Sequence, residues 1–197
     1  MSILSFKKSS FLNASFPGKK VKKRPLLVIS GKSNVGKSSL INYLCQNKKL
    51  AHISSVPGKT QTINYFEINE KLLLIDLPGY GFSQTGKQKK LEWEKEIELF
   101  FKKEKNQISL LLLLIDARRS FSQKDRLMHA WAKYYKLPVL FILTKIDKFN
   151  KTSFNKNLQK VIDSLPEETP YFSYSMKNFK LRRNLINTIT KNMKGKF

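Results

Sequence analysis

The chain has 197 residues, of which 41% are hydrophobic and 12% aromatic, enough for one domain with a sizeable core. A formal net charge of +24 attracts polyanions, either nucleic acid or an anionic membrane surface, unless the many lysines only reflect an A/T-rich genome. The single cysteine, Cys45, excludes an internal disulfide and favours a cytoplasmic protein, and the longest apolar run, at 110–115, is too short to cross a bilayer.

Residues 1–24 contain no acidic residue and several serines and lysines. This balance is typical of a transit peptide, but the segment lacks the continuous apolar region of a signal peptide. We expect a basic N-terminal arm here, followed by a single domain over residues 25–197. No internal repeat or linker divides that domain.

Apolar, β-rich stretches alternate with amphipathic stretches along the domain, which favours an α/β fold with a mostly parallel sheet. Six strands are expected, at 26–30, 63–68, 71–76, 108–115, 138–143 and 170–174. Helices are expected at 38–47, 88–104, 122–136, 153–164 and 178–193. Only Asn69 and Glu70 separate the second and third strands, so these should form a hairpin with one antiparallel edge strand.

The stretch GKSNVGKS, residues 31–38, joins the first strand to the first helix with the spacing of a phosphate-binding loop. Its glycines allow a tight turn whose N–H groups point at phosphate oxygens, and the helix N-terminus adds partial positive charge. Lys37 can reach the β- and γ-phosphates, and the Ser38 hydroxyl can ligate Mg²⁺. The residues expected to contact the nucleotide are Gly31, Lys32, Ser33, Asn34, Val35, Gly36, Lys37, Ser38 and Ser39.

A second motif, DLPG, ends the strand at 71–76. Ligands of parallel sheets bind beyond the carboxyl ends of the strands. There the Asp76 carboxylate can hold a Mg²⁺-bound water, and the Gly79 N–H can meet a γ-phosphate. Alone, the D-x-x-G pattern is weak evidence for a nucleotide site, but its position one strand after a phosphate loop makes it strong evidence. The residues expected at the nucleotide are Asp76, Leu77, Pro78 and Gly79.

The polar loop VPGKTQT, residues 56–62, lies between the first helix and the second strand. A threonine there could supply a second Mg²⁺ ligand when the γ-phosphate is present. Thr60 and Thr62 both qualify by position.

The stretch TKID, residues 144–147, follows the strand at 138–143. The Asp147 carboxylate can accept two hydrogen bonds from N1–H and the 2-amino group of guanine, a donor pair that adenine lacks. Lys145 can lay its stem along the purine ring, and Thr144 opens the motif. We therefore predict a guanine-specific site.

The stretch YFSYSMK, residues 171–177, ends the last expected strand. Backbone N–H groups of Ser173, Tyr174 and Ser175 could meet the guanine carbonyl oxygen. A strand followed by a helix cap explains the same residues nearly as well, and the register of the three is open.

In this order, the motifs resemble those of a translation-factor-class GTPase and, more specifically, of the EngB/YihA/YsxC family of bacterial ribosome-assembly GTPases. The resemblance runs from about Phe11 to the C-terminal helix. Its stretches are FLNASF, GKSNVGKSSLIN, PGKTQTIN, DLPGYGF, DARRSFSQKD, LPVLFILTKIDK and FSYSMK. Because FLNASF belongs to it, a cleaved leader over residues 1–24 is not expected.

The resemblance implies a three-layer, Ras-like P-loop GTPase fold and hydrolysis of GTP to GDP and phosphate with Mg²⁺. It also implies a switch that docks on the maturing large ribosomal subunit, with an indirect link to cell division and septation. We expect a cytoplasmic monomer. A basic surface would favour such docking, because lysines bind the RNA phosphates with an affinity that falls as the salt concentration rises.

The same resemblance implies roles for individual residues. Thr60 becomes the switch I threonine, and Ser38, Thr60 and Asp76 surround Mg²⁺. Lys37, Thr60 and Gly79 act on the transferred phosphoryl group. Asn34 stands where some related GTPases hold a potassium ion. The loop that would close over the nucleotide consists of Gly58, Lys59, Thr60, Gln61 and Thr62.

Three positions depart from the expected patterns. Lys32 replaces an arginine that is usual in the family, and Tyr174 replaces a serine. Tyr80 follows the DLPG motif where Ras-like switches place a water-orienting glutamine. We therefore expect slow hydrolysis by the isolated protein, accelerated by potassium or by a partner.

Two other functions stay open. One is a P-loop ATPase or kinase, which an Asp147→Asn change without effect on nucleotide preference would favour. The other is a nucleotide-regulated binding module for membrane or division proteins with no ribosomal role, which binding to anionic lipid would favour.

Overall fold

The computed structural model describes residues 4–15, 24–52, 62–81, 87–119, 121–175 and 180–194. Its strands are β1 (Ser9–Ser15), β2 (Leu26–Gly31), β3 (Ile63–Ile68), β4 (Leu72–Asp76), β5 (Ile108–Asp116), β6 (Val139–Thr144) and β7 (Tyr171–Ser173). Its α-helices are α1 (Lys37–Cys45), α2 (Lys87–Glu104), α3 (Gln123–Tyr134), α4 (Phe154–Ile162) and α5 (Leu181–Asn192). Two short 3₁₀ turns, η1 (Ile146–Lys148) and η2 (Lys151–Ser153), precede α4.

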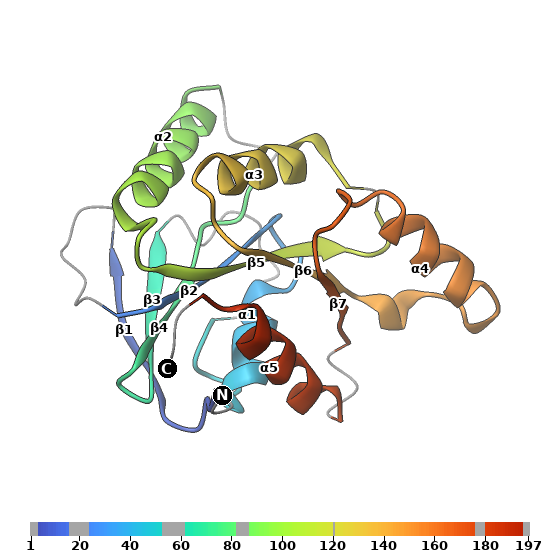
Figure 1. The fold of residues 1–197 in the computed structure, drawn as a ribbon, viewed down its shortest axis with the longest axis horizontal. Helices are drawn as coiled ribbons and strands as arrows, with labels where there is room; N and C mark the ends of the chain where they lie inside the picture. The colour runs from blue at the N-terminus through green and yellow to red at the C-terminus, as the bar shows by residue number, and fades with distance from the viewer. Residues whose placement is uncertain are drawn as a thin grey trace.

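The strands form one seven-stranded sheet in the order β1-β3-β4-β2-β5-β6-β7 (Figure 1). β4, β2, β5, β6 and β7 run parallel, whereas β3 is antiparallel to both β4 and β1. The expected α/β class, the parallel body and the hairpin between the second and third expected strands are confirmed. The five expected helices are present, with ends shifted by up to three residues.

The sheet has one strand more than the six expected. β1 comes from residues 9–15, inside the segment expected to form a basic N-terminal arm, and pairs with β3. Its sequence, SSFLNAS, is mostly polar and has no alternation of apolar residues, which is why the strand was not predicted. It is an edge strand with an irregularity between Phe11 and Asn13, and the Phe11 ring contacts Phe66 of β3 edge-on at 5.5 Å.

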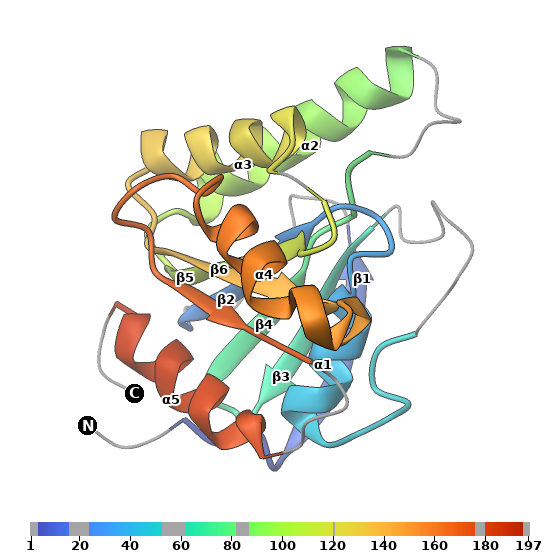
Figure 2. The same cartoon turned by 90° about the vertical axis from the view of Figure 1, so that its right-hand side faces the viewer.

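Helices cover both faces of the sheet, α1 and α5 one face and α2, α3 and α4 the other (Figures 1 and 2). Successive strand residues point to opposite faces, so the side chains of β2 pack in two hydrophobic cores, one on each face of the sheet. Leu27 and Ile29 pack in the cluster with α1 and α5, and Leu26 and Val28 pack in the cluster with α2 and α3. Among the described helices, none is long and apolar enough to span a membrane.

The parallel arrangement decides where the predicted motifs meet. The phosphate loop follows β2, the DLPG stretch follows β4, and the TKID stretch follows β6, so all three leave the same edge of the sheet. β5 lies between β2 and β6 and ends at Asp116, opposite Thr144. That edge is where a doubly wound sheet binds its ligand.

Candidate nucleotide site

The loop between β2 and α1 is a tight turn that depends on two glycines. Gly31 has φ 154°, and a Cβ there would lie 2.8 Å from the Leu114 carbonyl oxygen and 2.9 Å from the Val35 side chain. Gly36 has φ 114° and caps the N-terminus of α1. Inside the turn, the Val35 N–H donates to the Lys32 carbonyl at 3.1 Å. The N-terminus of α1 therefore faces the edge where the strands end, as an anion site requires.

Lys37, Asp76 and Gly79 come together beside this loop. A Cβ on Gly79 would lie only 2.9 Å from the Lys37 Nζ, so the ammonium group is against the DLPG glycine. Asp76 is 3% exposed, and burial raises the pKa of its carboxyl to about 6 although Lys37 opposes the shift. Its Oδ1 has no hydrogen-bond partner among the described residues.

These residues fit a magnesium ion. Asp76 offers a buried carboxylate oxygen without a donor, and Ser38 offers a half-buried hydroxyl at the start of α1. Such oxygens are the ligands that Mg²⁺ prefers, directly or through water. The described residues contain no cluster of three His, Cys, Asp or Glu side chains that could hold a metal by themselves. A Mg²⁺ site with so few protein ligands takes most of its ligands from waters and from the phosphate oxygens of the bound nucleotide.

The DLPG stretch is bonded directly to the phosphate loop. The Ser33 N–H donates to the Tyr80 carbonyl at 2.9 Å, and the Ser33 hydroxyl donates to the Gly79 carbonyl at 3.2 Å. Gly81, at φ 87°, lies against the stem of Lys32. A displacement of Gly79 therefore moves or breaks its bonds to the loop between β2 and α1.

Tyr80 does not point toward the phosphates. It is 3% exposed, and its hydroxyl donates to Oδ1 of Asp125 in α3. Burial, and then the Asp125 charge, raise the pKa of Tyr80 far above its usual value. The other carboxylate oxygen of Asp125 accepts from the Ser122 backbone at 2.8 Å and from the Ser122 hydroxyl, closing a capping box. Tyr80 thus anchors its segment to α3.

A tryptophan completes the anchor from the other helix. The Trp93 indole N–H, in α2, donates to the Pro78 carbonyl at 3.1 Å, and its ring contacts Tyr80 at 5.9 Å and Trp131 of α3 at 6.2 Å. The sequence motifs do not predict these links. Only the Ser-x-x-Asp spacing at 122–125, a helix-start pattern, could have drawn attention to Asp125.

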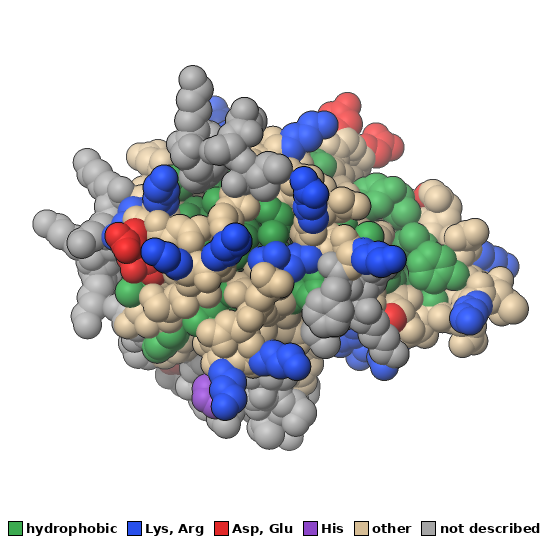
Figure 3. Space-filling view, turned by 90° about the horizontal axis from the view of Figure 1, so that it is seen from below, with side chains coloured by type: hydrophobic (Ala, Val, Ile, Leu, Met, Phe, Trp, Pro, Cys, Tyr) green, Lys and Arg blue, Asp and Glu red, His purple; other side chains and the backbone are tan. Residues whose placement is uncertain are grey.

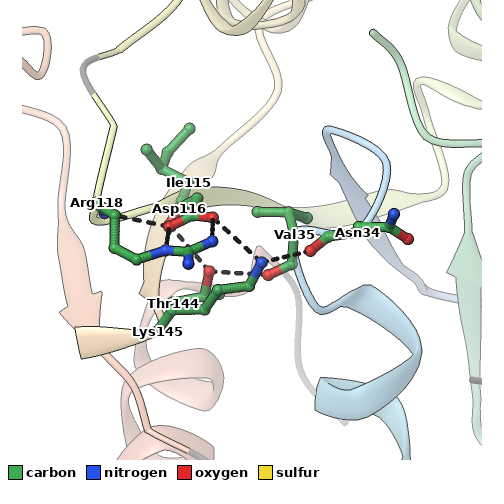
Figure 4. Close-up of polar contacts among 7 residues, drawn as sticks. All are labelled: Asn34, Val35, Ile115, Asp116, Arg118, Thr144 and Lys145. Carbon is green, nitrogen blue, oxygen red and sulfur yellow. Dashed lines mark hydrogen bonds and ion pairs between the residues drawn. The ribbon is translucent and has the colours of Figure 1, made fainter. Parts of the chain in front are cut away.

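The TKID stretch is tied to the phosphate loop by two side chains (Figure 4). The buried Thr144 hydroxyl donates to the Val35 carbonyl at 2.9 Å, with the Ile115 carbonyl at 3.2 Å as a second acceptor. The Lys145 Nζ donates to the Asn34 carbonyl at 2.6 Å and lies 3.1 Å from Oδ2 of Asp116. The halves predicted to bind phosphate and base are therefore one connected structure.

Asp147 lies in η1 with its side chain exposed, and its Oδ1 accepts from the Ser175 hydroxyl at 3.2 Å. Tyr174 is 2% exposed, packs edge-on against Tyr43 at 5.0 Å, and donates its N–H to the Leu143 carbonyl at 2.8 Å. Among the three residues whose register was open, Ser175 approaches the predicted base-binding carboxylate, Tyr174 faces the core, and Ser173 ends β7.

Part of the predicted site lies outside the described residues. These positions are Gly58, Lys59, Thr60 and Gln61. Thr62 is described, half-buried, directly before β3. The Mg²⁺ ligand and switch roles expected of this loop stay predictions.

Comparison with known proteins agrees with this geometry. Residues 26–145 match the family model of the 50S ribosome-binding GTPase. A Shouchella clausii (strain KSM-K16) protein named "Probable GTP-binding protein EngB" is 42% identical over 144 residues, 73% of each chain. The crystal structure of a probable GTP-binding protein engB is similar with a TM-score of 0.64 and 21% identity, over 84% of this chain and 97% of that one. Era in complex with MgGDPNP and nucleotides 1506-1542 of 16S ribosomal RNA is also similar, with a TM-score of 0.64 and 26% identity, over 88% of this chain and 58% of that one.

Proposed function

This chain belongs to the EngB family of P-loop GTPases, and from that premise we propose that it is a GTP-driven switch in assembly of the large ribosomal subunit. The observation that carries the proposal is the direct bonding of the DLPG segment both to the phosphate loop, through Ser33, and to α3, through Tyr80. A group that contacts Gly79 can therefore shift α2 and α3, because the neighbouring residues Pro78 and Tyr80 are bonded to these helices.

In the proposed reaction, water attacks the γ-phosphate of GTP. The N–H groups of the phosphate loop and the Lys37 ammonium hold the phosphates and offset the charge that develops on the transferred group. Magnesium, bound by Ser38, through water by Asp76, and by Thr60, would neutralise further charge on the β- and γ-phosphates. The Tyr80 hydroxyl is engaged with Asp125, so it does not orient the attacking water, which fits a slow isolated enzyme.

We assign guanine recognition to Asp147, with Lys145 beneath the purine ring. An exposed carboxylate that already accepts from Ser175 has free acceptor capacity for the N1–H and 2-amino pair. Asn34, at φ 63°, is the residue we assign to a potassium ion that would stand in for an absent arginine finger.

The switch itself would use the γ-phosphate to hold Gly79 and Thr60. Loss of the phosphate releases Gly79, and the bonds of its neighbour Tyr80 to α3 and of Pro78 to Trp93 carry the change to the helices. The partner in this proposal meets the α2 and α3 side differently in the two nucleotide states.

A strongly basic surface supports an RNA partner. α5 contains Arg182, Arg183 and Lys191 but no acidic residue, and α1 has none either. Figure 3 shows Lys and Arg side chains spread over the face seen from below, with few acidic ones among them. The structurally similar Era was crystallised with 16S ribosomal RNA, and the family model is that of a 50S-binding GTPase. We place this protein, as a cytoplasmic monomer linked indirectly to division and septation, on the large subunit.

Co-sedimentation with purified large ribosomal subunits tests the proposal. The protein is mixed with subunits in the presence of a non-hydrolysable GTP analogue, GDP or no nucleotide, across a salt series, with anionic vesicles in parallel. We expect retention with the GTP analogue alone at elevated salt. Equal, salt-labile binding in all three states, or nucleotide-dependent binding to vesicles only, would refute the ribosomal role and leave the GTPase.

A further inference from the structure

Asp116, at the carboxyl end of β5, belongs to none of the nucleotide-binding motifs, but it is the centre of a charged network that includes Lys145 (Figure 4). Its Oδ1 accepts from the Arg118 Nε at 2.9 Å and from the Arg118 backbone N–H at 3.1 Å. Its Oδ2 accepts from the Arg118 Nη2 at 2.6 Å and from the Lys145 Nζ at 3.1 Å. One carboxylate therefore joins a planar, two-pronged arginine contact to the lysine of the TKID stretch.

The position of Asp116 in the sheet explains why it can do this. β5 pairs with β2 on one side and with β6 on the other, and Asp116 lies opposite Thr144. The phosphate loop leaves β2 and the TKID stretch leaves β6, so the end of β5 lies between them. Lys145 spans this gap, because its Nζ reaches the Asn34 carbonyl as well as Asp116.

The chemistry of the network favours a fixed lysine. Lysine has a flexible four-carbon stem and a point charge, so one acceptor alone leaves many rotamers open. Burial would raise the pKa of Asp116, but hydrogen bonds from Arg118 and the Lys145 charge lower it to about 2. The carboxylate therefore stays ionised at every pH at which the protein is used. With one acceptor in the phosphate loop and the other at the end of β5, the Lys145 stem is held in one direction before any ligand arrives.

We propose that Asp116 is a positioning residue of the guanine site, which holds the Lys145 stem in place as a preformed floor for the purine, and that Arg118 locks Asp116 in the orientation that does so. The inference rests on the proposed assignment of residues 144–147 to guanine. Preorganisation of this kind appears as affinity and slow release, because less conformational freedom is lost when the ligand binds. Asp147 reads the base edge, and Asp116 acts only through Lys145.

A double-mutant cycle tests the inference, with fluorescent mant-GDP as the probe and Kd and dissociation rate as readouts. Asp116→Ala should weaken binding about 3- to 10-fold, the cost of immobilising one long side chain only when the ligand binds. In a Lys145→Ala background, the same change should have no further effect. Arg118→Ala should weaken binding severalfold, whereas Arg119→Ala, an exposed neighbour of equal charge, should leave it within about twofold.

The outcomes are separable. Asp147→Asn serves as the control for the site itself. If it abolishes mant-GDP binding but Asp116→Ala leaves binding unchanged, or if the Asp116 and Lys145 effects multiply, the positioning role is refuted and the guanine site stands. If Asp147→Asn binds mant-GDP normally, the guanine assignment fails and takes this inference with it. Asp116→Asn, which keeps the side-chain shape, should weaken binding in the same direction, and melting curves exclude a folding defect as the cause.

Discussion

Replacing Tyr80 by phenylalanine removes one hydroxyl from the link between the DLPG segment and α3. The ring can keep its contact with Trp93, so the change isolates the hydrogen bond to Asp125. Asp125 is buried and keeps its two bonds from Ser122, but Oδ1 loses its donor. A hydrogen bond to a charged group contributes about 1.5–3 kcal/mol, so we expect Tyr80→Phe to lower the free energy of unfolding by about 2 kcal/mol.

Urea unfolding and thermal melting measure this loss. For a domain of this length, about 2 kcal/mol lowers the melting temperature by about 4–8 °C. Tryptophan fluorescence is a direct probe, since Trp93 contacts Tyr80 and the chain has 2 tryptophans in all. Tyr134→Phe is the matched control, because Tyr134 lies in α3 with 79% of its surface exposed and its loss should cost under about 0.5 kcal/mol.

The cycle with Asp125→Ala shows whether the loss belongs to this bond. Asp125→Ala also removes the capping box of α3, so alone it should cost more than Tyr80→Phe. In the Asp125→Ala background, Tyr80→Phe should then cost close to nothing. A coupling energy near zero, or a Tyr80→Phe effect no larger than that of Tyr134→Phe, would contradict the anchoring described for this segment.

Three further outcomes are expected. Burial raises the pKa of Asp76 to about 6, so the metal-free wild type loses stability as pH rises from about 4 through about 6. At pH 7 in chelator, Asp76→Asn should therefore have a free energy of unfolding up to about 3 kcal/mol above that of wild type, with no difference near pH 4. Equal pH profiles of the two proteins would contradict this. Gly79→Ala places a Cβ 2.9 Å from Lys37 Nζ and Ser33 Oγ, and single-turnover GTP hydrolysis should slow at least about tenfold. Phosphate release should be faster in potassium than in sodium, and Asn34→Ala should remove the difference; equal rates in both salts argue against a bound potassium ion.

The parts of this protein that were predictable from sequence are those in which one local rule decides. The apolar run at 110–115 is typical of a strand buried on both faces, and the spacing from Gly31 to Ser38 is that of a loop whose N–H groups surround a phosphate. β1 escaped prediction because SSFLNAS has no pattern of its own and becomes a strand only by pairing with β3.

The charged and aromatic links escaped prediction for a different reason. Tyr80 and Asp125 are 45 positions apart, and Asp116 and Lys145 are 29 positions apart. Each pair is brought together by the arrangement of the strands and helices, so no local sequence pattern could predict it. Tyr174 shows the same limit, because its partner Tyr43 is distant in the sequence. Either side of the chain after β7 could have faced the core, and packing against Tyr43 decided it.

The bond from the Thr144 hydroxyl to the Val35 carbonyl joins residues 109 positions apart, and it has a consequence for synthesis of the protein. The phosphate-binding loop is made early, but the segment that closes the base end of the same site is made only after β6. A chain still being translated cannot form the complete pocket, because contacts of such sequence separation come late in folding. Nucleotide should therefore stabilise only chains that already contain β6 and the TKID stretch, and GDP should protect the full-length protein from protease while leaving a truncation before residue 139 unprotected.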